Sequence, residues 1–489
     1  MKLKIKIVIP VALILLSWSC TKDYIKMNTN PNAATVVPAT NVLGTSILNS
    51  CYQLFGERLD IYYAGTYAGQ TAAIISGDYE YRVGINNDIW KGMYISMAYA
   101  VDAMKLAKTE GNDNLYAAAL TMKAYNAHKA TDMWGKIPYS EAFKLDEGIT
   151  YPKYDTEQEV YTQILAELKT AADLFSTDGK AMGPGDFLFK GNVDKWKKFC
   201  NSTRLRVAIR MSSADEAAAK TVLAEILNNP AKYPVIAVNE DNAYFWWSGV
   251  APDQELWYER MGADNGIKTD WYRTCNYLVS NLKLLNDPRL PVYADKNKWG
   301  KYNGYTFGVD QRSDTMNSGN NVSFIGDRFG NNKAGFSPFL NAAEVYFLKA
   351  EAYERGLVAG GNAKEAYEAG IKMSLKENGI DETAITNFLS VSEVAWNSGT
   401  TSNLKKIYLQ KWISLFKQSV EAWAEARRTD VPLMPYVETN YAAAHNRPPF
   451  RMAYADEEKS LNTNFPTDVK ETDIFWGTQM WWDKRTGVH

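Results

Sequence analysis

Apolar residues recur at steps of three and four along much of this chain, and this period restricts its possible folds more than any other feature. Between Trp90 and Met104 the apolar residues occupy one face of a helix. The same period predicts further helices over 115–125, 161–175, 196–207, 346–353, 363–373 and 404–427. One such helix cannot bury its apolar face alone, so we expect the helices to pack in pairs. The sequence therefore predicts a mostly α-helical protein.

The segment from Ala343 to Ala369 resembles a tetratricopeptide repeat, a helix–turn–helix unit of about 34 residues. Small residues such as Ala350 and Gly370 lie at helical steps in its two halves, where they let two helices approach closely. Gly360 and Gly361 stand in the turn between them. Helical repeats are expected over about 40–215 and 341–428.

Two long stretches lack a helical period. Residues 236–340 and 430–489 are rich in Gly, Asn, Asp and aromatic residues. Long irregular stretches in a compact domain are usually functional. We expect these stretches to fold over the helical body as the ligand-binding parts.

The N-terminus has the pattern of an export signal. Lys2, Lys4 and Lys6 precede the apolar run 7–16, which is too short to span a bilayer, and Cys20 follows a small residue. We predict a signal peptide over 1–19, lipidation of Cys20 and a tether over 20–38. A plain secreted protein, cleaved nearby, is the alternative.

Composition argues against several function classes. The formal net charge of −2 argues against a nucleic-acid partner. With only three histidines, the chain offers little for a multi-histidine metal site, and no phosphate-loop, zinc-protease or nucleophile-elbow motif is present. We expect no cofactor, no metal and no catalytic residue. Cys51, Cys200 and Cys275 are interpreted as core residues, with a disulfide between two of them as the alternative.

Aromatic residues are abundant: 15 Trp, 30 Tyr and 18 Phe. Flat rings with polar neighbours suit a sugar, which has one face of C–H groups and a rim of hydroxyls. Aromatic and polar residues in segments largely outside helical period are therefore the candidate ligand contacts: Asp78, Tyr79, Arg82, Trp90, Trp246, Trp257, Tyr258, Trp271, Trp299 and Tyr302. Trp90 also lies on the helical face described above, which favours the core for this ring. Alternatively, these rings fill the core beneath long loops. Trp246 and Trp247 would point to opposite faces of an extended segment, so at most one of them faces a ligand.

Several short segments resemble one family when taken in order behind the export signal. They are 28–33 (NTNPNA), 131–143 (TDMWGKIPYSEAF), 201–206 (NSTRLR), 286–291 (NDPRLP), 339–344 (FLNAAE), 421–423 (EAW), 427–429 (RRT) and 481–483 (WWD). Together they are similar to the SusD-like (SusD/RagB) outer-membrane lipoproteins.

The resemblance implies about four tetratricopeptide-type helix pairs that support a loop-rich part, in a single domain over 39–489. It implies a lipid-anchored, surface-exposed outer-membrane protein, although the inner leaflet stays open. It also implies a nutrient-uptake role in which the protein binds oligosaccharides and delivers them to a SusC-like TonB-dependent transporter, without being an enzyme.

Three alternatives remain from the sequence. One is a peptide ligand within the same import system. Another is an all-helical glycoside hydrolase that works with two carboxylates, for which Glu255 and Asp264 are candidates. The third is a repeat scaffold that binds only protein or peptide.

Overall fold

The structure of the 489-residue chain is a computed structural model. It describes residues 37–73, 79, 82–262, 271–306, 319–434, 447–470 and 474–488. Contacts divide the chain at Pro38, and Ala39–His489 forms one compact unit. The predicted signal peptide, Cys20 and nearly all of the predicted tether lie outside the described residues. Among the described residues, no helix combines the length and the apolar character needed to cross a membrane.

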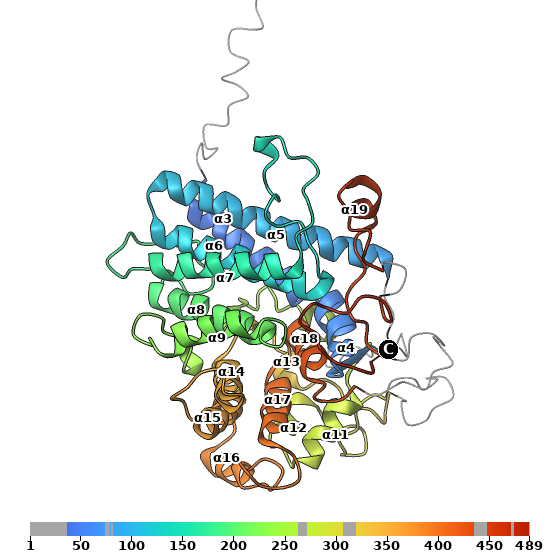
Figure 1. Ribbon diagram of the computed structural model, residues 1–489. Coiled ribbons are helices and arrows are strands. Elements are labelled where there is room, and N and C mark those ends of the chain that lie inside the picture. Colours follow the sequence, from blue (N-terminus) through green and yellow to red (C-terminus); the bar gives the residue numbers. More distant parts are fainter. Residues whose placement is uncertain are drawn as a thin grey trace, which may run out of the picture. The chain divides into compact units, whose positions relative to one another are not determined.

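The N-terminal half is a series of packed helices, in which each helix contacts the next along the chain. After α3, a π-helix (η1), the short α4 and strand β1, the chain forms α5 to α9, which Figure 1 shows stacked beside α3. Their bounds are α3 Ala39–Leu54, η1 Glu57–Ala64, α4 Gly65–Tyr67, β1 Thr71–Ala73, α5 Val83–Glu110, α6 Asp113–Trp134, α7 Glu157–Leu174, α8 Val193–Met211 and α9 Glu216–Leu227. A 3-10 turn, η2 Leu145–Glu147, lies between α6 and α7.

Polar side chains define where these helices begin. The Asn112 side chain accepts a hydrogen bond from the Leu115 N–H at the start of α6 (3.1 Å). At α7 the Thr156 side chain and the Glu159 carboxylate each accept from the other's backbone N–H, which is a capping box. Each bond satisfies a donor that the first helical turn would otherwise leave without a partner.

The C-terminal helices form a second group, with α14 packed against both α15 and α17. Their bounds are α14 Ala342–Glu354, α15 Ala363–Glu377, α16 Glu382–Leu389, α17 Asn403–Ser414, α18 Ser419–Thr429 and α19 Asp456–Leu461. Gly370 permits the close approach of α15 to α14, because a Cβ there would lie 2.8 Å from a Phe347 ring carbon. The predicted mostly helical fold with tetratricopeptide-like pairs is confirmed.

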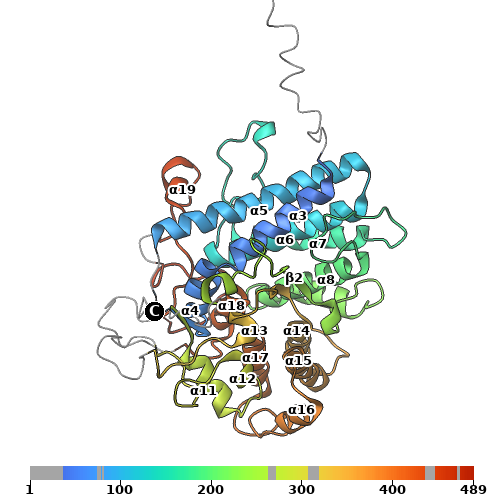
Figure 2. The same ribbon diagram turned by 180° about the vertical axis from the view of Figure 1, so that it is seen from behind.

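The segment between α9 and α14 holds short elements and two small sheets. β1 pairs antiparallel with β3, and β2 pairs antiparallel with β4, which leads directly into α14. Figure 2 shows β2 near α8 and α14. The bounds are η3 Asn239–Asp241, β2 Ala243–Trp246, α10 Tyr258–Met261, β3 Tyr272–Thr274, α11 Asn276–Leu284, α12 Leu290–Tyr293, α13 Asp327–Gly330 and β4 Phe336–Leu340. These strand pairs attach the irregular segment to the helical body.

Buried ion pairs connect the two helical groups. Arg206 on α8 donates two hydrogen bonds of 2.6 Å to Glu344 on α14, and both side chains are fully buried. Arg210 on α8 and Lys129 on α6 both pair with Glu421 on α18. These pairs satisfy charges that would be very costly to bury alone.

The three cysteines Cys51, Cys200 and Cys275 are buried free thiols. The prediction that they are core residues is therefore confirmed, and the alternative of a disulfide is wrong.

Candidate functional site

Burial separates the ten sequence-predicted ligand contacts into distinct groups. Trp246, Trp271 and Trp299 expose 59%, 58% and 65% of their surfaces. Arg82 is exposed and Tyr302 is half-buried. The remaining described candidates are buried: Tyr79, Trp90, Trp257 and Tyr258. Asp78 lies outside the described residues.

The buried candidates have packing roles in this structure. Trp90 packs edge-on against Trp134, with ring centroids 4.9 Å apart. The Trp257 indole N–H donates to the buried Asp60 carboxylate at 3.1 Å. Their ligand contact stays an untested prediction, and their burial leaves no open ring face for a sugar.

Two concave surfaces carry the other candidates. The first, here called the η1 groove, lies between α3, η1, α5 and α10 and has a volume of about 260 Å³. Its lining residues are Tyr52, Gln53, Gly56, Glu57, Arg58, Leu59, Asp88, Ile89, Leu256, Glu259 and Arg260. Residues from two segments that the sequence singled out, around 78–90 and 253–271, therefore meet across η1.

Charged groups of both signs line the η1 groove. The Arg58 guanidinium pairs with Asp88 at 2.8 Å, and both side chains are largely exposed. Glu57 accepts a hydrogen bond from the Tyr272 hydroxyl, and its other carboxylate oxygen lies 3.3 Å from the Arg260 Nε. Carboxylates and guanidinium groups offer paired acceptors and donors that match neighbouring hydroxyls on one ligand.

Aromatic residues lie in the groove wall and on the chain segments next to it. Tyr52 lines the groove and is partly exposed. Trp271 directly precedes Tyr272, whose hydroxyl bonds Glu57. Arg82 lies over the Tyr62 ring of η1 at 5.6 Å, and its backbone N–H donates to the Tyr63 hydroxyl at 2.6 Å. The groove therefore combines ring surfaces with groups that bond hydroxyls.

The buried carboxylate of Asp60, a residue of η1, connects η1 to α18 and to the segment before α10. Asp60 accepts from the Ser419 N–H (2.8 Å) at the start of α18 and from the Trp257 indole before α10. Burial raises the pKa of Asp60 to about 7, against the lowering effect of these bonds and of Lys417. π-Helical turns often occur at functional sites, and this one places Glu57 and Arg58 in the groove.

Trp299 and Tyr302 lie on a separate turn over 297–305. The Trp299 indole N–H donates to the Asn321 side chain at 2.8 Å. Asn297 accepts hydrogen bonds from the backbone N–H groups of Trp299 and Lys301. The turn thus holds an exposed indole in a defined position.

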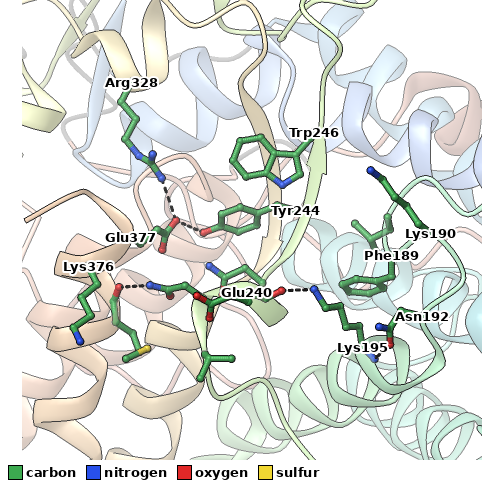
Figure 3. Close-up of a pocket in the computed structure, with 15 residues that line it drawn as sticks. Phe189, Lys190, Asn192, Lys195, Glu240, Tyr244, Trp246, Arg328, Lys376 and Glu377 are labelled. Atoms are coloured by element: carbon green, nitrogen blue, oxygen red, sulfur yellow. Dashed lines mark hydrogen bonds and ion pairs between the residues drawn. The ribbon is translucent and has the colours of Figure 1, made fainter. Parts of the chain in front are cut away.

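The second concave surface, here called the β2 pocket, has a volume of about 820 Å³. It lies between the start of α8, the segment that leads into β2, α13 and the end of α15 (Figure 3). Its lining residues are Leu188, Phe189, Lys190, Asn192, Lys195, Val238, Asn239, Glu240, Asn242, Tyr244, Trp246, Arg328, Met373, Lys376 and Glu377. Of the nine predicted ligand contacts that the structure describes, only Trp246 is in this set.

The alternation of β2 places its side chains on opposite faces. Trp246 is exposed, whereas Trp247 is 3% exposed and donates to the Ser337 hydroxyl at 3.0 Å. The prediction that these two residues face opposite ways is confirmed. Tyr244 and Phe336 stack with centroids 4.7 Å apart, and Trp246 packs on Phe336 at 5.2 Å.

Sequence reasoning missed most of the charged residues of both surfaces. Glu57 and Arg58 reach the η1 groove on the π-helix, and Arg260 reaches it on α10. Lys190, Arg328 and Lys376 reach the β2 pocket from three separate elements. Neither juxtaposition leaves a local signal in the sequence.

Of the two carboxylates considered for hydrolysis, the structure describes only Glu255. Glu255 is buried, contacts Lys417 at 2.7 Å and accepts from the Trp257 and Tyr258 backbone N–H groups. Asp264 lies outside the described residues. Within the described ranges, no cluster of three or more His, Cys, Asp or Glu side chains is arranged to hold a metal ion.

Comparisons with known proteins agree over most of the chain. The profile of the SusD-like family, described as "Starch-binding associating with outer membrane", matches residues 31–455. No curated protein matches the chain.

Solved structures share the fold. A chitin-binding SusD homologue from Flavobacterium johnsoniae is 27% identical with a TM-score of 0.75, covering 92% of this chain and 98% of the other. A SusD homologue from Bacteroides fragilis is 22% identical with a TM-score of 0.74, covering 92% and 100%. A structure described as a chitin-binding protein is 23% identical with a TM-score of 0.79, also covering 92% and 100%. The family profile extends over far more than half of the sequence, and the chain therefore belongs to the SusD-like family.

Proposed function

We propose that this protein binds oligosaccharides at the cell surface and delivers them to a SusC-like TonB-dependent transporter in the outer membrane. The family match over residues 31–455 is the observation that carries this proposal. The family description names starch binding and association with the outer membrane, and a relative 27% identical is described as chitin-binding. The protein acts by binding and not by catalysis.

The η1 groove and the neighbouring Trp271 are the proposed oligosaccharide site. A sugar ring that stacks on an exposed indole buries its C–H face, and its hydroxyls keep polar partners. Glu57, Arg58 and Asp88 supply those partners within the groove. Trp299 and Tyr302 are proposed to extend the ring surface for a longer ligand.

The binding experiment uses the full chain in detergent and isothermal titration calorimetry. Soluble chitooligosaccharides and malto-oligosaccharides are the first probes, because the related descriptions name chitin and starch. Trp271→Ala is expected to weaken binding roughly tenfold, which corresponds to about 1.4 kcal/mol. The matched control is Leu284→Ala, which removes an exposed apolar side chain at the end of α11.

The outcomes separate the ligand classes. Saccharide binding that Trp271→Ala weakens and Leu284→Ala leaves unchanged supports the proposal. Binding of peptides and of no saccharide would replace the carbohydrate ligand with a peptide. Release of new reducing ends during incubation would instead identify a hydrolase.

Membrane attachment and delivery need separate tests. We expect metabolic labelling with a fatty acid to mark the wild-type protein and to be lost in Cys20→Ser. Purification from the native outer membrane is expected to recover a TonB-dependent barrel with the wild-type protein. Recovery without any barrel would refute delivery while leaving the binding role intact.

A further inference from the structure

The β2 pocket lies apart from the η1 groove in its lining residues and differs from it in charge. Four cationic side chains line the pocket (Lys190, Lys195, Arg328 and Lys376). Among the described residues, two carboxylates line the same surface, those of Glu240 and Glu377. Figure 3 shows Lys190 and Lys195 on one side, Arg328 and Lys376 on the other, and Trp246 and Tyr244 between them.

One of the two carboxylates is already neutralised by its neighbours. The Tyr244 hydroxyl donates to Glu377, and the Arg328 guanidinium lies 3.6 Å from the same carboxylate. Burial raises the pKa of Glu377, against the lowering effect of the Tyr244 hydrogen bond and of Arg328. The Arg328–Glu377 pair cancels one positive and one negative charge, so among the described lining residues Lys190, Lys195 and Lys376 are opposed only by Glu240.

The two lysines on the α8 side keep their charge available. The Lys195 ammonium donates to the Glu240 backbone carbonyl, and among the described residues no carboxylate lies within ion-pairing distance of Lys190 or Lys195. Lys376, in contrast, pairs with Glu382 at 2.6 Å. A ligand would thus meet its strongest attraction beside α8.

Lys190 lies in a loop that hydrogen bonds to a buried carboxylate stabilise. The buried Asp186 carboxylate accepts from the Phe189 N–H (3.1 Å), the Gly191 N–H (2.7 Å) and the Trp196 indole (2.7 Å). Lys190 itself has φ +55°, a left-handed conformation that is uncommon outside glycine. A buried acceptor therefore maintains an otherwise disfavoured backbone that presents this lysine to the pocket.

The pocket also has features of a sugar site. Trp246 exposes 59% of its surface and is supported from behind by Phe336. Asn192 and Asn242 supply amide groups along the wall, which can bond hydroxyls. A volume of about 820 Å³ suits a ligand of several rings and greatly exceeds what a lone ion needs.

We infer that the β2 pocket is a second saccharide site that binds an acidic sugar unit, with its ring on Trp246 and its carboxylate or sulfate between Lys190 and Lys195. Carboxylated and sulfated sugars share this chemistry. The inference uses the carbohydrate ligand class of the proposed function but does not depend on the η1 groove.

The test measures affinity of the full chain for trigalacturonate, which carries carboxylates, and for a κ-carrageenan tetrasaccharide, which carries sulfates. Fully methyl-esterified trigalacturonate is the neutral match of the first probe. The variants are Trp246→Ala and the double variant Lys190→Gln/Lys195→Gln. The control is Lys220→Gln/Lys364→Gln, which removes two exposed lysines outside the pocket.

At least one acidic probe is expected to bind the wild-type protein. Both pocket variants are expected to bind that probe at least tenfold more weakly, whereas the control double variant is expected to bind it with wild-type affinity. The methyl ester is expected to bind at least tenfold more weakly than trigalacturonate. Added salt is expected to weaken wild-type binding more steeply than binding by Lys190→Gln/Lys195→Gln. Preference for trigalacturonate or for the sulfated probe identifies the acid group.

Three results would overturn the inference: neither acidic probe binds, the methyl ester binds as tightly as the acid, or the pocket variants bind the acidic probe normally. A loss of acidic-probe binding in Trp271→Ala but not in Trp246→Ala would place that ligand in the η1 groove and also overturn it. If neutral saccharides fail to bind while the acidic probe depends on Trp246, the inference stands and the proposed η1 site fails. Thermal melting of each variant checks that these exposed substitutions leave the fold intact.

Discussion

Trp257 and Trp271 lie only fourteen positions apart, and the structure predicts opposite effects when each is replaced by alanine. Trp257 is fully buried, with its ring 5.8 Å from that of Phe416 and its indole N–H bonded to Asp60. Trp271 exposes 58% of its surface. We therefore expect Trp257→Ala to lower stability and Trp271→Ala to lower affinity.

The size of the stability loss follows from the burial. Truncating a buried tryptophan to alanine costs about 3–5 kcal/mol. Losing the donor to the buried Asp60 oxygen adds roughly 1 kcal/mol. The compact unit of roughly 450 residues unfolds with an entropy of about 2.1 cal/mol/K per residue. A loss of about 5 kcal/mol therefore lowers the melting temperature by about 5 °C, whereas Trp271→Ala is expected to shift it by less than about 1 °C.

Calorimetric melting of both variants at one scan rate, together with saccharide titration, measures both effects. Trp257→Phe, which keeps a ring but removes the donor, is expected to fall between the wild type and Trp257→Ala. A Trp257→Ala protein that melts like the wild type but binds the saccharide more weakly would refute the assignment of this ring to the core.

Three further predictions concern buried polar groups. Glu344→Ala removes the two 2.6 Å bonds of the buried Arg206, which keeps only the Phe339 carbonyl, Gln418 and a longer contact with Glu421. The change is expected to cost about 3 kcal/mol in unfolding free energy by denaturant titration; unchanged stability would show that water reaches this pair. Asp186→Ala leaves the Gly191 N–H and the Trp196 indole without their acceptor and is expected to cost roughly 3 kcal/mol, with unchanged melting as the contrary result. Burial raises the pKa of Glu157 to about 8, so the folded state favours its neutral form. The unfolding free energy of wild type relative to Glu157→Gln should therefore be largest below about pH 4.5 and should fall as the pH rises to about 8. The slope of this fall should approach about 1.4 kcal/mol per pH unit, and a difference that grows with pH would contradict this sign.

The helical body was predictable from the sequence because its signals are local. The spacing of apolar residues along α5 and α7 repeats every helical turn. The opposite faces of Trp246 and Trp247 follow from the alternation of an extended strand in the same way. Each of these predictions needs only a few consecutive residues.

The binding surfaces were only partly predictable. The sequence marked the aromatic segments, and the helical face on which Trp90 lies favoured the core for that ring, but nothing in the sequence distinguished Trp257 from Trp271. Their exposures differ because burial depends on which distant elements cover each ring.

The amino-acid sequence by itself determined the helices, their caps, the export signal pattern and the family. Only the tertiary structure decided that Arg58 meets Asp88 across η1, and that Lys190 and Arg328 face one pocket. Helix formation depends on residues within one turn of each other. A concave site is formed by segments that are far apart in the sequence, and the sequence of each segment does not show which other segment it contacts.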